Sequence, residues 1–258
     1  MSIVQWTVLG SGSGIPSKNR ACCGHLLSLN GRSIMFDCGS GVMSSYLCAG
    51  HGREELEAIL ISHTHADHIT DLPIIIQWLK AMTRMDDLDI YLPEEAIRPI
   101  NAYLDAVYLF REKLPFRLNL RPLTESILLL GGKLNIASVP NSHEYGNRGF
   151  IASAGYPNRM ECFSFSIIIE GGRRIFYSAD IGSFEEIEHY IQNIDLLVLE
   201  TSHVDLIELG DRLSESNIKI IILSHIADER ENLVRKVAGA YVGRGELSLA
   251  EDGLTVTI

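Results

Sequence analysis

The sequence has no long hydrophobic run and no excess of positive charge. No stretch approaches the roughly 20 apolar residues that a membrane-spanning helix needs, and the first residues lack the basic and apolar regions of a secretory signal peptide. Lys and Arg number 22 against 33 Asp and Glu, which gives a net charge of -11 at pH 7. Proteins that bind nucleic acid usually carry a basic surface that neutralises phosphates. We therefore expect a cytoplasmic protein with no membrane partner, in which local positive charge or bound metal would meet any RNA or nucleotide substrate.

The sequence also lacks paired cysteines and linkers. Its five cysteines are an odd number, and none has the C-x-x-C spacing of a thiolate zinc site. We expect them to be free thiols in a reducing compartment: Cys22, Cys23, Cys38, Cys48 and Cys162. No low-complexity tract or Pro/Gly/Ser-rich segment divides the 258 residues, so we expect a single domain over 1–258.

The periodicity of apolar residues predicts an α/β protein. Strands are expected at 3–10, 24–29, 32–37, 56–62, 88–93, 133–140, 163–170, 174–180, 194–200, 218–225 and 254–258. Helices are expected at 40–50, over most of 72–110, at 184–193 and at 229–241. The sequence "EGG" at 170–172 predicts a tight hairpin turn. Strand-rich blocks with helices occur twice, which predicts two sheets packed together with helices outside.

Several apolar strands end in a polar residue that can bind metal. These endings are Asp37 in "MFD", His63 in "ILISH", Asp180 in "FYSAD", Glu200 in "LVLE" and His225 in "IILSH". Ligand sites in α/β sheets gather at strand ends, where a rigid scaffold holds functional loops. Five such endings predict one shared site.

The segment "HTHADH" at 63–68 is the densest of these features. His63 and His65 are two residues apart, so in extended backbone their imidazoles project to the same side and can bind one ion. Asp67 and His68 follow as the chain turns, and they could face a second ion. Imidazole and carboxylate ligands suit zinc, with manganese or iron as alternatives, and the absence of thiolate argues against a structural zinc cage.

The segment "HTHADH" resembles the H-x-H-x-D-H signature of the metallo-β-lactamase-fold hydrolases. The resemblance extends over nearly the whole chain, because further segments occur in the order of that superfamily: "LGSGSGIPSKNR", "MFDCGSG", "PNSHEYG", "FYSAD" and "LSHIA". Together they look most like its ribonuclease Z branch, which usually cuts the 3' trailer from precursor tRNA, while a sister set hydrolyses small phosphodiesters. The resemblance implies an αββα sandwich with two mixed sheets and helices on the outer faces.

The same resemblance implies a dinuclear metal site. Its first ion would be held by His63, His65 and His143, its second by Asp67, His68 and His225, with Asp180 bridging both. Asp37 would orient ligand imidazoles from outside the metal shell. Two such metals can share a hydroxide, lower the pKa of its parent water towards about 7, and stabilise negative charge on a phosphoryl or acyl oxygen.

Two further roles concern protons. Asp67 lies between ligand histidines and could accept a proton from the nucleophilic water. "LETSH" resembles the His-Glu-Ala-Thr segment of the ribonuclease Z branch, with Glu200 matched and Leu199 in place of its histidine. His203, three residues after Glu200, is our candidate proton donor to the leaving group, because its place at a strand end would bring it to the rim of the site.

Substrate contacts are predicted in two loops. "PSKNR" at 16–20 resembles a P-x-K-x-R-N loop of the branch, with Ala21 in place of the asparagine, so Lys18 and Arg20 could contact a phosphate. Ribonucleases Z commonly carry a long Gly/Pro- and Lys-rich arm that clamps tRNA, and the sequence shows no such insertion between His143 and Asp180. The loop at 144–162 is instead a candidate substrate lid. Its phosphate-binding candidates are Arg148 and Arg159, and those that could stack on a base are Tyr145, Phe150 and Tyr156.

Other classes fit less well. A β-lactamase would need a signal peptide, and glyoxalase II-like thioesterases usually show Pro-Gly-His-Thr where this chain has "VPNSHEYG". His65 argues against a flavodiiron protein, in which a carboxylate replaces one signature histidine. A non-catalytic metal-binding module would ordinarily have lost ligands, whereas all seven positions are filled here. We predict a dinuclear metal-dependent hydrolase that favours phosphodiesters. The alternatives are a tRNA 3' endoribonuclease proper and a thioesterase or other ester hydrolase; dimers are common in the branch, so a homodimer is possible.

Overall fold

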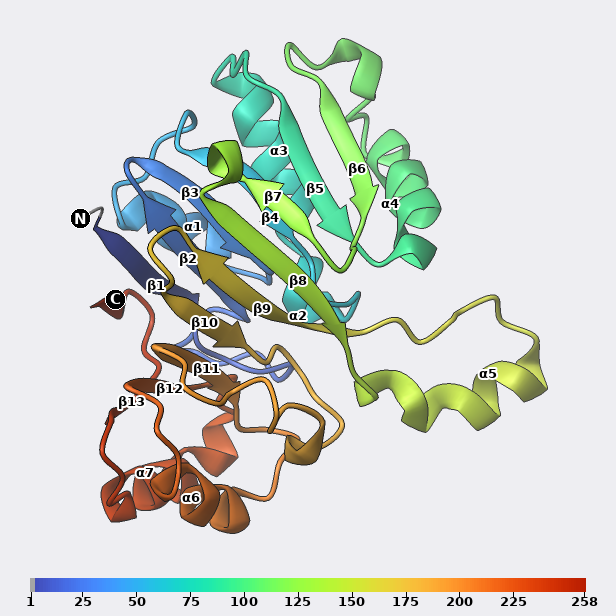
Figure 1. Ribbon diagram of the computed structural model, residues 1–258. Coiled ribbons are helices and arrows are strands. Elements are labelled where there is room, and N and C mark those ends of the chain that lie inside the picture. The colour runs from blue at the N-terminus through green and yellow to red at the C-terminus, as the bar shows by residue number, and fades with distance from the viewer. Residues whose placement is uncertain (1–2) are drawn as a thin grey trace. The chain divides into compact units, whose positions relative to one another are not determined.

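The computed structural model describes residues 3–258 and divides into two compact units. Unit 1 comprises the chain up to Leu123 together with Glu251–Ile258, and unit 2 comprises Thr124–Ala250. Each unit contains one seven-stranded sheet and its own helices (Figure 1). The division joins the last eight residues to the N-terminal unit, because β14 pairs with β1.

The sheet of unit 1 has the strand order β14-β1-β2-β3-β4-β5-β6. Its strands are β1 (Val4–Gly10), β2 (Gly24–Leu29), β3 (Arg32–Phe36), β4 (Leu56–Leu60), β5 (Leu88–Leu92), β6 (Leu118–Pro122) and β14 (Thr255–Thr257). Pairing is antiparallel from β14 to β3 and parallel from β3 to β6. The carboxyl ends of β3 and β4 therefore lie at the same edge, and they lead into Asp37 and the segment 61–68.

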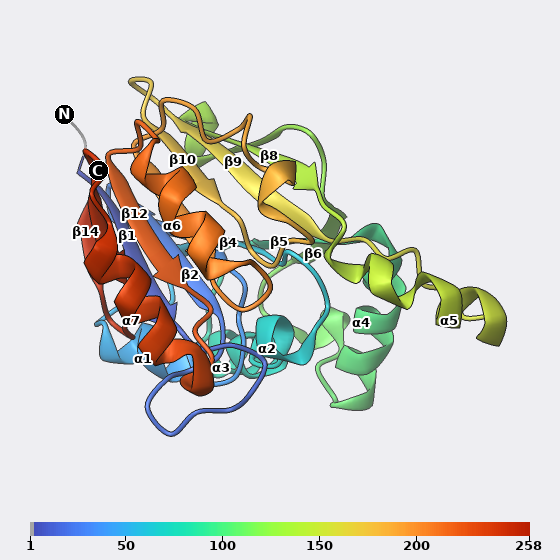
Figure 2. The same cartoon turned by 90° about the horizontal axis from the view of Figure 1, so that it is seen from below.

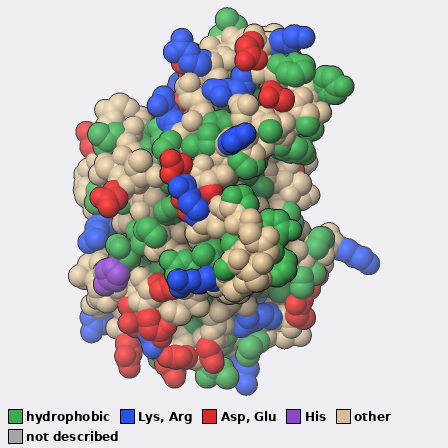
Figure 3. Space-filling model, turned by 90° about the vertical axis from the view of Figure 1, so that its right-hand side faces the viewer, with side chains coloured by type: hydrophobic (Ala, Val, Ile, Leu, Met, Phe, Trp, Pro, Cys, Tyr) green, Lys and Arg blue, Asp and Glu red, His purple; other side chains and the backbone are tan. Residues whose placement is uncertain are grey.

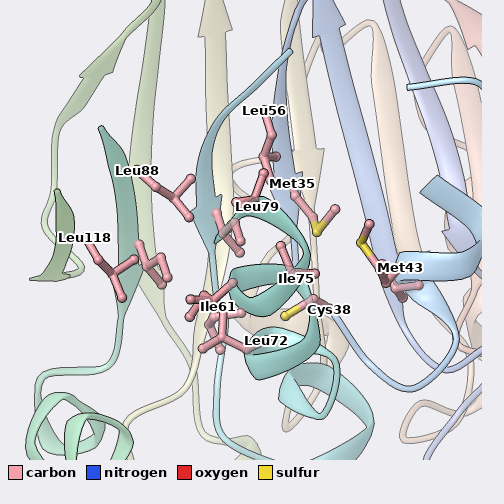
Figure 4. Close-up of a cluster of buried hydrophobic side chains, with 14 of the residues drawn as sticks. Met35, Cys38, Met43, Leu56, Ile61, Leu72, Ile75, Leu79, Leu88 and Leu118 are labelled. Atoms are coloured by element: carbon pink, nitrogen blue, oxygen red, sulfur yellow. The ribbon is translucent and has the colours of Figure 1, made fainter. Parts of the chain in front are cut away.

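The α-helices of unit 1 pack on its sheet through apolar side chains. They are α1 (Val42–Cys48), α2 (Ala66–Ile69), α3 (Leu72–Ala81) and α4 (Glu94–Ala106), and the short 3-10 helix η1 (Arg111–Lys113) follows them. Ile75 and Leu79 lie one helical turn apart on α3 and pack against strand residues such as Leu88, as Figure 4 shows. This core holds the start of α2, and with it the predicted metal ligands, on a rigid base.

The sheet of unit 2 has the strand order β13-β12-β11-β10-β9-β8-β7. Its strands are β7 (Ile127–Leu129), β8 (Leu134–Pro140), β9 (Phe163–Ile169), β10 (Arg174–Tyr177), β11 (Leu196–Glu200), β12 (Ile220–Ser224) and β13 (Glu246–Leu249). Pairing is antiparallel from β7 to β10 and parallel from β10 to β13. The parallel half again gathers its carboxyl ends at one edge, next to Asp180, Glu200 and His225.

Two helices of unit 2 cover one face of its sheet. The helical elements are η2 (Leu130–Gly132), η3 (His143–Asn147), α5 (Arg148–Ala154), η4 (Phe184–Glu186), α6 (Leu206–Ser214), η5 (Asp228–Arg230) and α7 (Glu231–Ala240). Helices α6 and α7 lie side by side (Figure 2), and Leu209 and Leu213 of α6 share an apolar cluster with Leu223 of β12. Helix α5 lies beyond the end of β8, away from this sheet (Figure 1), and none of its residues is buried.

The predicted fold class is confirmed, since the structure contains two mixed sheets with helices. The hairpin at 170–172 is also confirmed: Gly171 and Gly172 adopt φ angles of 92° and 87° between β9 and β10. The single-domain prediction stays a prediction. All five cysteines are free, and four of them are buried. In residues 3–258 no helix is both long enough and apolar enough to cross a bilayer.

The helix predicted at 184–193 is wrong. Only η4 forms there, followed by turns. Phe184, Ile187 and Ile191 are buried, as the apolar periodicity of the sequence predicts. They lie in successive turns and not on one face of an α-helix. Ser142 donates two hydrogen bonds to the Glu186 carboxylate, from its backbone N and from Oγ. This anchor holds the start of the segment by tertiary contacts that override helix propensity.

Candidate metal centre

The histidine segment of unit 1, residues 63–68, leaves β4 through Ile61 and Ser62. His63 and His68 are fully buried. The extended backbone at His63 and His65 brings His63 Nε2 within 3.0 Å of His65 Nδ1. Helix α2 then begins after His65, which places Asp67 Oδ2 3.4 Å from His68 Nε2. The four side chains therefore lie close together within this unit.

Asp37 orients this segment from the end of β3. Its carboxylate accepts hydrogen bonds from Ser62 N at 2.7 Å, Ser62 Oγ at 2.9 Å and His68 Nδ1 at 2.9 Å. The Ser62 hydroxyl proton is engaged by Asp37, so His63 Nδ1, 3.0 Å from Ser62 Oγ, acts as the donor of that pair. A proton on Nδ1 of both His63 and His68 leaves each Nε2 with a lone pair, which is the form that binds metal. Ser62 was not anticipated from the sequence.

Close backbone packing holds the segment in place. A Cβ on Gly39 would lie 1.9 Å from the carbonyl oxygen of Asp67, so only glycine fits there. In the loop after β1, a Cβ added to Gly14 would lie 3.4 Å from Asp67 Oδ2, in ordinary van der Waals contact with that carboxylate. Burial, followed by the negative charge of Asp37, raises the pKa of the Cys38 thiol, which keeps it protonated beside the segment.

The strand-end set of unit 2 comprises His143, Asp180, His203 and His225. Asp180 is at its centre and is 2% exposed. Its Oδ2 lies 3.7 Å from His143 Nε2 and 3.6 Å from His203 Nδ1, and its Oδ1 lies 3.4 Å from His225 Nε2. The chain places these residues after β8, β10, β11 and β12 respectively. The strand ends of this unit thus bring four side chains with metal-binding atoms close together.

A buried amide links two members of this set. Asn141 donates from Nδ2 to the carbonyl oxygen of Asp180 at 3.0 Å, and its Oδ1 accepts from His143 N at 3.1 Å. Nearby, a Cβ on Gly182 would lie 2.1 Å from Ser142 Oγ, so a side chain there would displace the hydroxyl that binds Glu186. Sequence reasoning missed Asn141. The only signal was its position two residues before a predicted ligand.

Backbone strain accompanies the candidate ligands. Asp37, Ala179 and His225 have φ angles of 57°, 47° and 56°, in the left-handed region that non-glycine residues rarely occupy. Each lies at or next to a strand end from which a candidate ligand or orienting carboxylate projects. Such conformations cost of order 1–3 kcal/mol each and cluster at functional sites.

Glu200 and His203 form a pair at the end of β11. Glu200 Oε2 accepts hydrogen bonds from Ser202 N at 2.7 Å and His203 N at 2.9 Å, and it lies 3.4 Å from His203 Nδ1. Glu200 Oε1 is buried and has no hydrogen-bond partner among residues 3–258. Arg230 holds the same loop by donating to the carbonyl oxygens of Ser202 and Val204. The loop therefore presents the His203 imidazole, 39% exposed, next to Asp180.

The spacing of donor atoms in each unit fits metal binding. Two ligands on a tetrahedral zinc with bonds of 2.0–2.1 Å are about 3.3 Å apart. The contacts of 3.4 to 3.7 Å around Asp180, and that of 3.4 Å between Asp67 and His68, are near this value and longer than hydrogen bonds. The donors are imidazole nitrogens and carboxylate oxygens, which suit zinc, manganese or iron.

The predicted substrate contacts lie in the loop after β1 and in the segment 144–162. Lys18 is exposed, while Arg20 is partly buried and donates from Nη1 to Ser11 Oγ at 2.7 Å. Arg148 begins α5 and is exposed, whereas Arg159 pairs with Glu161 at 2.7 Å. The segment 144–162, predicted as a loop, contains the helix α5. The exposed rings of two lid residues, Phe150 and Tyr156, stack on each other with centroids 5.9 Å apart.

The chain is similar in sequence to ribonucleases Z and in fold to a solved metallo-β-lactamase fold protein. Ribonuclease Z of Clostridium perfringens is 26% identical over 65% of this chain and 52% of that protein, so the chain matches about half of its length. Ribonuclease Z of Thermobifida fusca is 23% identical over 100% of this chain and 96% of that protein. The solved metallo-β-lactamase fold protein YhfI of Bacillus subtilis superposes with a TM-score of 0.75 at 24% identity, covering 99% of this chain and 100% of that one.

The family model described as the β-lactamase superfamily domain matches residues 32–226. This span runs from β3 to the residue after His225, so it includes the histidine segment and the strand-end set. With the fold similarity and the ribonuclease Z relatives, it confirms the resemblance inferred from the sequence. The chain belongs to the metallo-β-lactamase superfamily.

Proposed function

We propose that the protein is a dinuclear metal-dependent phosphodiesterase. In this proposal His63, His65 and His143 would hold one ion, Asp67, His68 and His225 would hold the other, and Asp180 would be a ligand to both. The observation that carries the proposal is the metal-like spacing of imidazoles and carboxylates within each unit, in a chain of this superfamily. Two zinc ions are our first choice, with manganese or iron as alternatives, in a cytoplasmic protein.

Bound metals would activate water and stabilise negative charge on the phosphoryl oxygens. The chain's own residues orient the ligands and handle protons. Asp37 and Ser62 fix the tautomers of His68 and His63. Asp67 accepts a proton from the attacking water, and His203 donates one to the departing oxygen, with Glu200 orienting its imidazole.

The charge distribution supports a small phosphodiester over a long RNA. On the face shown in Figure 3, blue cations are scattered among acidic and uncharged side chains rather than gathered in one basic patch. The net charge of -11 opposes the binding of a polyanion. Lys18, Arg20 and Arg148 are proposed as local phosphate contacts, and the 144–162 segment as a lid over the substrate.

The second candidate is a tRNA 3' endoribonuclease. It is favoured by the relatives named ribonuclease Z and by α5, an exposed helix in the segment where that branch carries its clamp. The stacked rings of Phe150 and Tyr156 could pack against a base.

One assay panel separates these functions. The metal-loaded protein is tested on bis(p-nitrophenyl) phosphate, on a thioester and on a precursor tRNA. We expect turnover of the phosphodiester that is lost on chelation and restored by zinc. Cleavage of the tRNA at the trailer would favour the endoribonuclease, and activity on the thioester alone would reject the phosphodiesterase. Silence on all three with metal bound would indicate a non-catalytic module.

A variant tests the role of His203. His203→Ala is expected to slow hydrolysis of esters with poor leaving groups by roughly 10²-fold or more, and of p-nitrophenyl esters much less, because a good leaving group needs no proton. His189→Ala, a histidine outside both ligand sets, is the matched control. Equal slowing of both esters would remove the proton-donor role and leave the metal site intact.

A further inference from the structure

Unit 2 contains a small pocket beside the strand-end set. Its volume is about 240 Å³, and it lies between the segment after Asp180 and the start of α6. This volume is equivalent to roughly eight water molecules in the liquid, enough for one ring or a short alcohol. The lining residues that matter here are Phe184, Glu185, His203, Asp205, Glu208 and Arg212. We call it the acid-rimmed pocket.

The acid-rimmed pocket shares a wall with the candidate metal centre. His203 lines it, and His203 Nδ1 lies 3.6 Å from Asp180 Oδ2. Gly182, two residues after Asp180, lines it as well. An alcohol group of the substrate that hydrogen-bonds the His203 imidazole can therefore extend into this pocket.

The walls combine an apolar base with excess negative charge. Phe184, Val204 and Leu209 are buried and supply the apolar part. Three carboxylates, those of Glu185, Asp205 and Glu208, line the pocket against one guanidinium, that of Arg212.

That guanidinium is already engaged. Arg212 donates to Glu185, Glu188 and Glu208 at 2.9, 2.6 and 2.6 Å, and it lies over the Phe184 ring at 5.6 Å from the centroid. A phosphate or carboxylate entering the pocket would have to compete with these three glutamates. An uncharged or cationic group does not compete with the glutamates for Arg212. The carboxylates at the rim also attract a cation.

We propose that the acid-rimmed pocket receives one ester group of the substrate and restricts it to a small alcohol without negative charge. The inference rests on the proposed hydrolase function and names its substrate class: a phosphodiester with a compact uncharged or cationic alcohol on the His203 side. A polynucleotide is disfavoured, because its next phosphate would approach the rim of Glu185 and Glu208.

A binding experiment tests the charge preference without catalysis. Benzyltrimethylammonium and benzenesulfonate, similar in ring and opposite in charge, are titrated into the isotope-labelled full chain while the backbone amides of Gly182, Phe184 and Val204 are followed. We expect saturable shifts with the ammonium and none with the sulfonate. In Glu185→Gln/Glu208→Gln the affinity for the ammonium probe should fall roughly tenfold, as expected from two unit charges at about 7 Å in water.

Kinetics then connect the pocket to the reaction. The wild-type enzyme and the double variant are compared on aryl phosphodiesters whose leaving group is neutral, cationic or anionic. For each ester, kcat/KM of the variant is divided by kcat/KM of the wild type, so that the intrinsic reactivity of the ester cancels. The anionic ester should gain in the double variant, while Ser183→Trp, which fills the pocket, should penalise bulky leaving groups over methyl esters. Glu188→Gln is the matched control, because Glu188 binds Arg212 without lining the pocket.

The outcomes are distinct. Equal binding of the two probes, or selectivity ratios unchanged in both the double variant and Ser183→Trp, would overturn the pocket assignment alone. No turnover of any phosphodiester by the wild-type protein would reject the proposed function and this inference together.

Discussion

The two ligand sets are built differently. In unit 1 the four candidate ligands occupy one stretch of six residues, and a single carboxylate, Asp37, orients it through Ser62 and His68. In unit 2 the four members follow four different strands, and their spacing depends on the whole sheet and on links such as Asn141. The first set is specified locally, whereas the second exists only when the sheet has formed. Substitutions should therefore act locally in unit 1 and through the scaffold in unit 2.

The largest expected effect is the loss of a ligand in either set. His63→Ala and Asp180→Ala should each lower phosphodiesterase activity on the order of 10³-fold, because a bound metal contributes several kcal/mol of charge stabilisation. Both should also bind less than two metal equivalents, measured by elemental analysis after desalting. If Asp180→Ala kept full metal content and activity, the strand-end set would not belong to the site.

Changing the orienting residues should have a smaller effect. Asp37→Asn and Asn141→Asp preserve size but disturb the hydrogen bonds to His68 and to the carbonyl of Asp180. Each is expected to weaken metal affinity by about 10- to 100-fold, as measured by competition with a chelating dye. Asn141→Asp should also lower the melting temperature more than Asp37→Asn does. The reverse order would contradict the distinction between local and scaffold-dependent sets.

Two arginines contrast the scaffolds of the units. Arg84 in unit 1 is fully buried and donates to the carbonyl oxygens of Arg53, Asp86 and Asp87 at 2.6 to 2.9 Å. Arg84→Ala should lower the free energy of unfolding by about 3 kcal/mol, because three carbonyls lose a charged donor. Arg212→Ala should have little effect on the free energy of unfolding, because the ion pairs of Arg212 lie on the surface. Denaturant titration of the two variants measures both losses. Equal losses would show that burial of the arginine does not determine its contribution to stability.

The smallest expected effect is a pH dependence in unit 1. Burial raises the pKa of Asp71 above 3.8, although its Oδ2 accepts hydrogen bonds from Gly41 N and Met43 N at the start of α1. With the folded pKa above the unfolded one, the ionised form costs stability, and this cost grows as the pH rises through the folded value. Asp71→Asn should therefore gain stability relative to wild type over the pH range just above 3.8. A relative loss over that range would contradict the assignment.

The locally specified histidine segment was easier to predict from the sequence than the residues that depend on the folded sheet. The histidine segment was visible because its spacing alone defines a chelating geometry, and strand-end residues such as Asp180 and His225 were visible because apolar runs stop there. Asn141, Ser62 and Glu186 were not visible, since an uncharged side chain or a lone glutamate carries no signal until the fold supplies its partner. The helix expected at 184–193 failed for the same reason, because Ser142 binds Glu186 across 44 residues of sequence. Helices α5 and α6 were missed as well.

The central claim is that the histidine segment and the strand-end set bind the same pair of ions. Anomalous X-ray scattering at the zinc edge, from crystals grown with zinc, tests it most directly. We predict two peaks, each with ligands from both 63–68 and the set containing His143, Asp180 and His225. Peaks ligated by only one of the two sets, or no peak beside Asp180, would contradict the account.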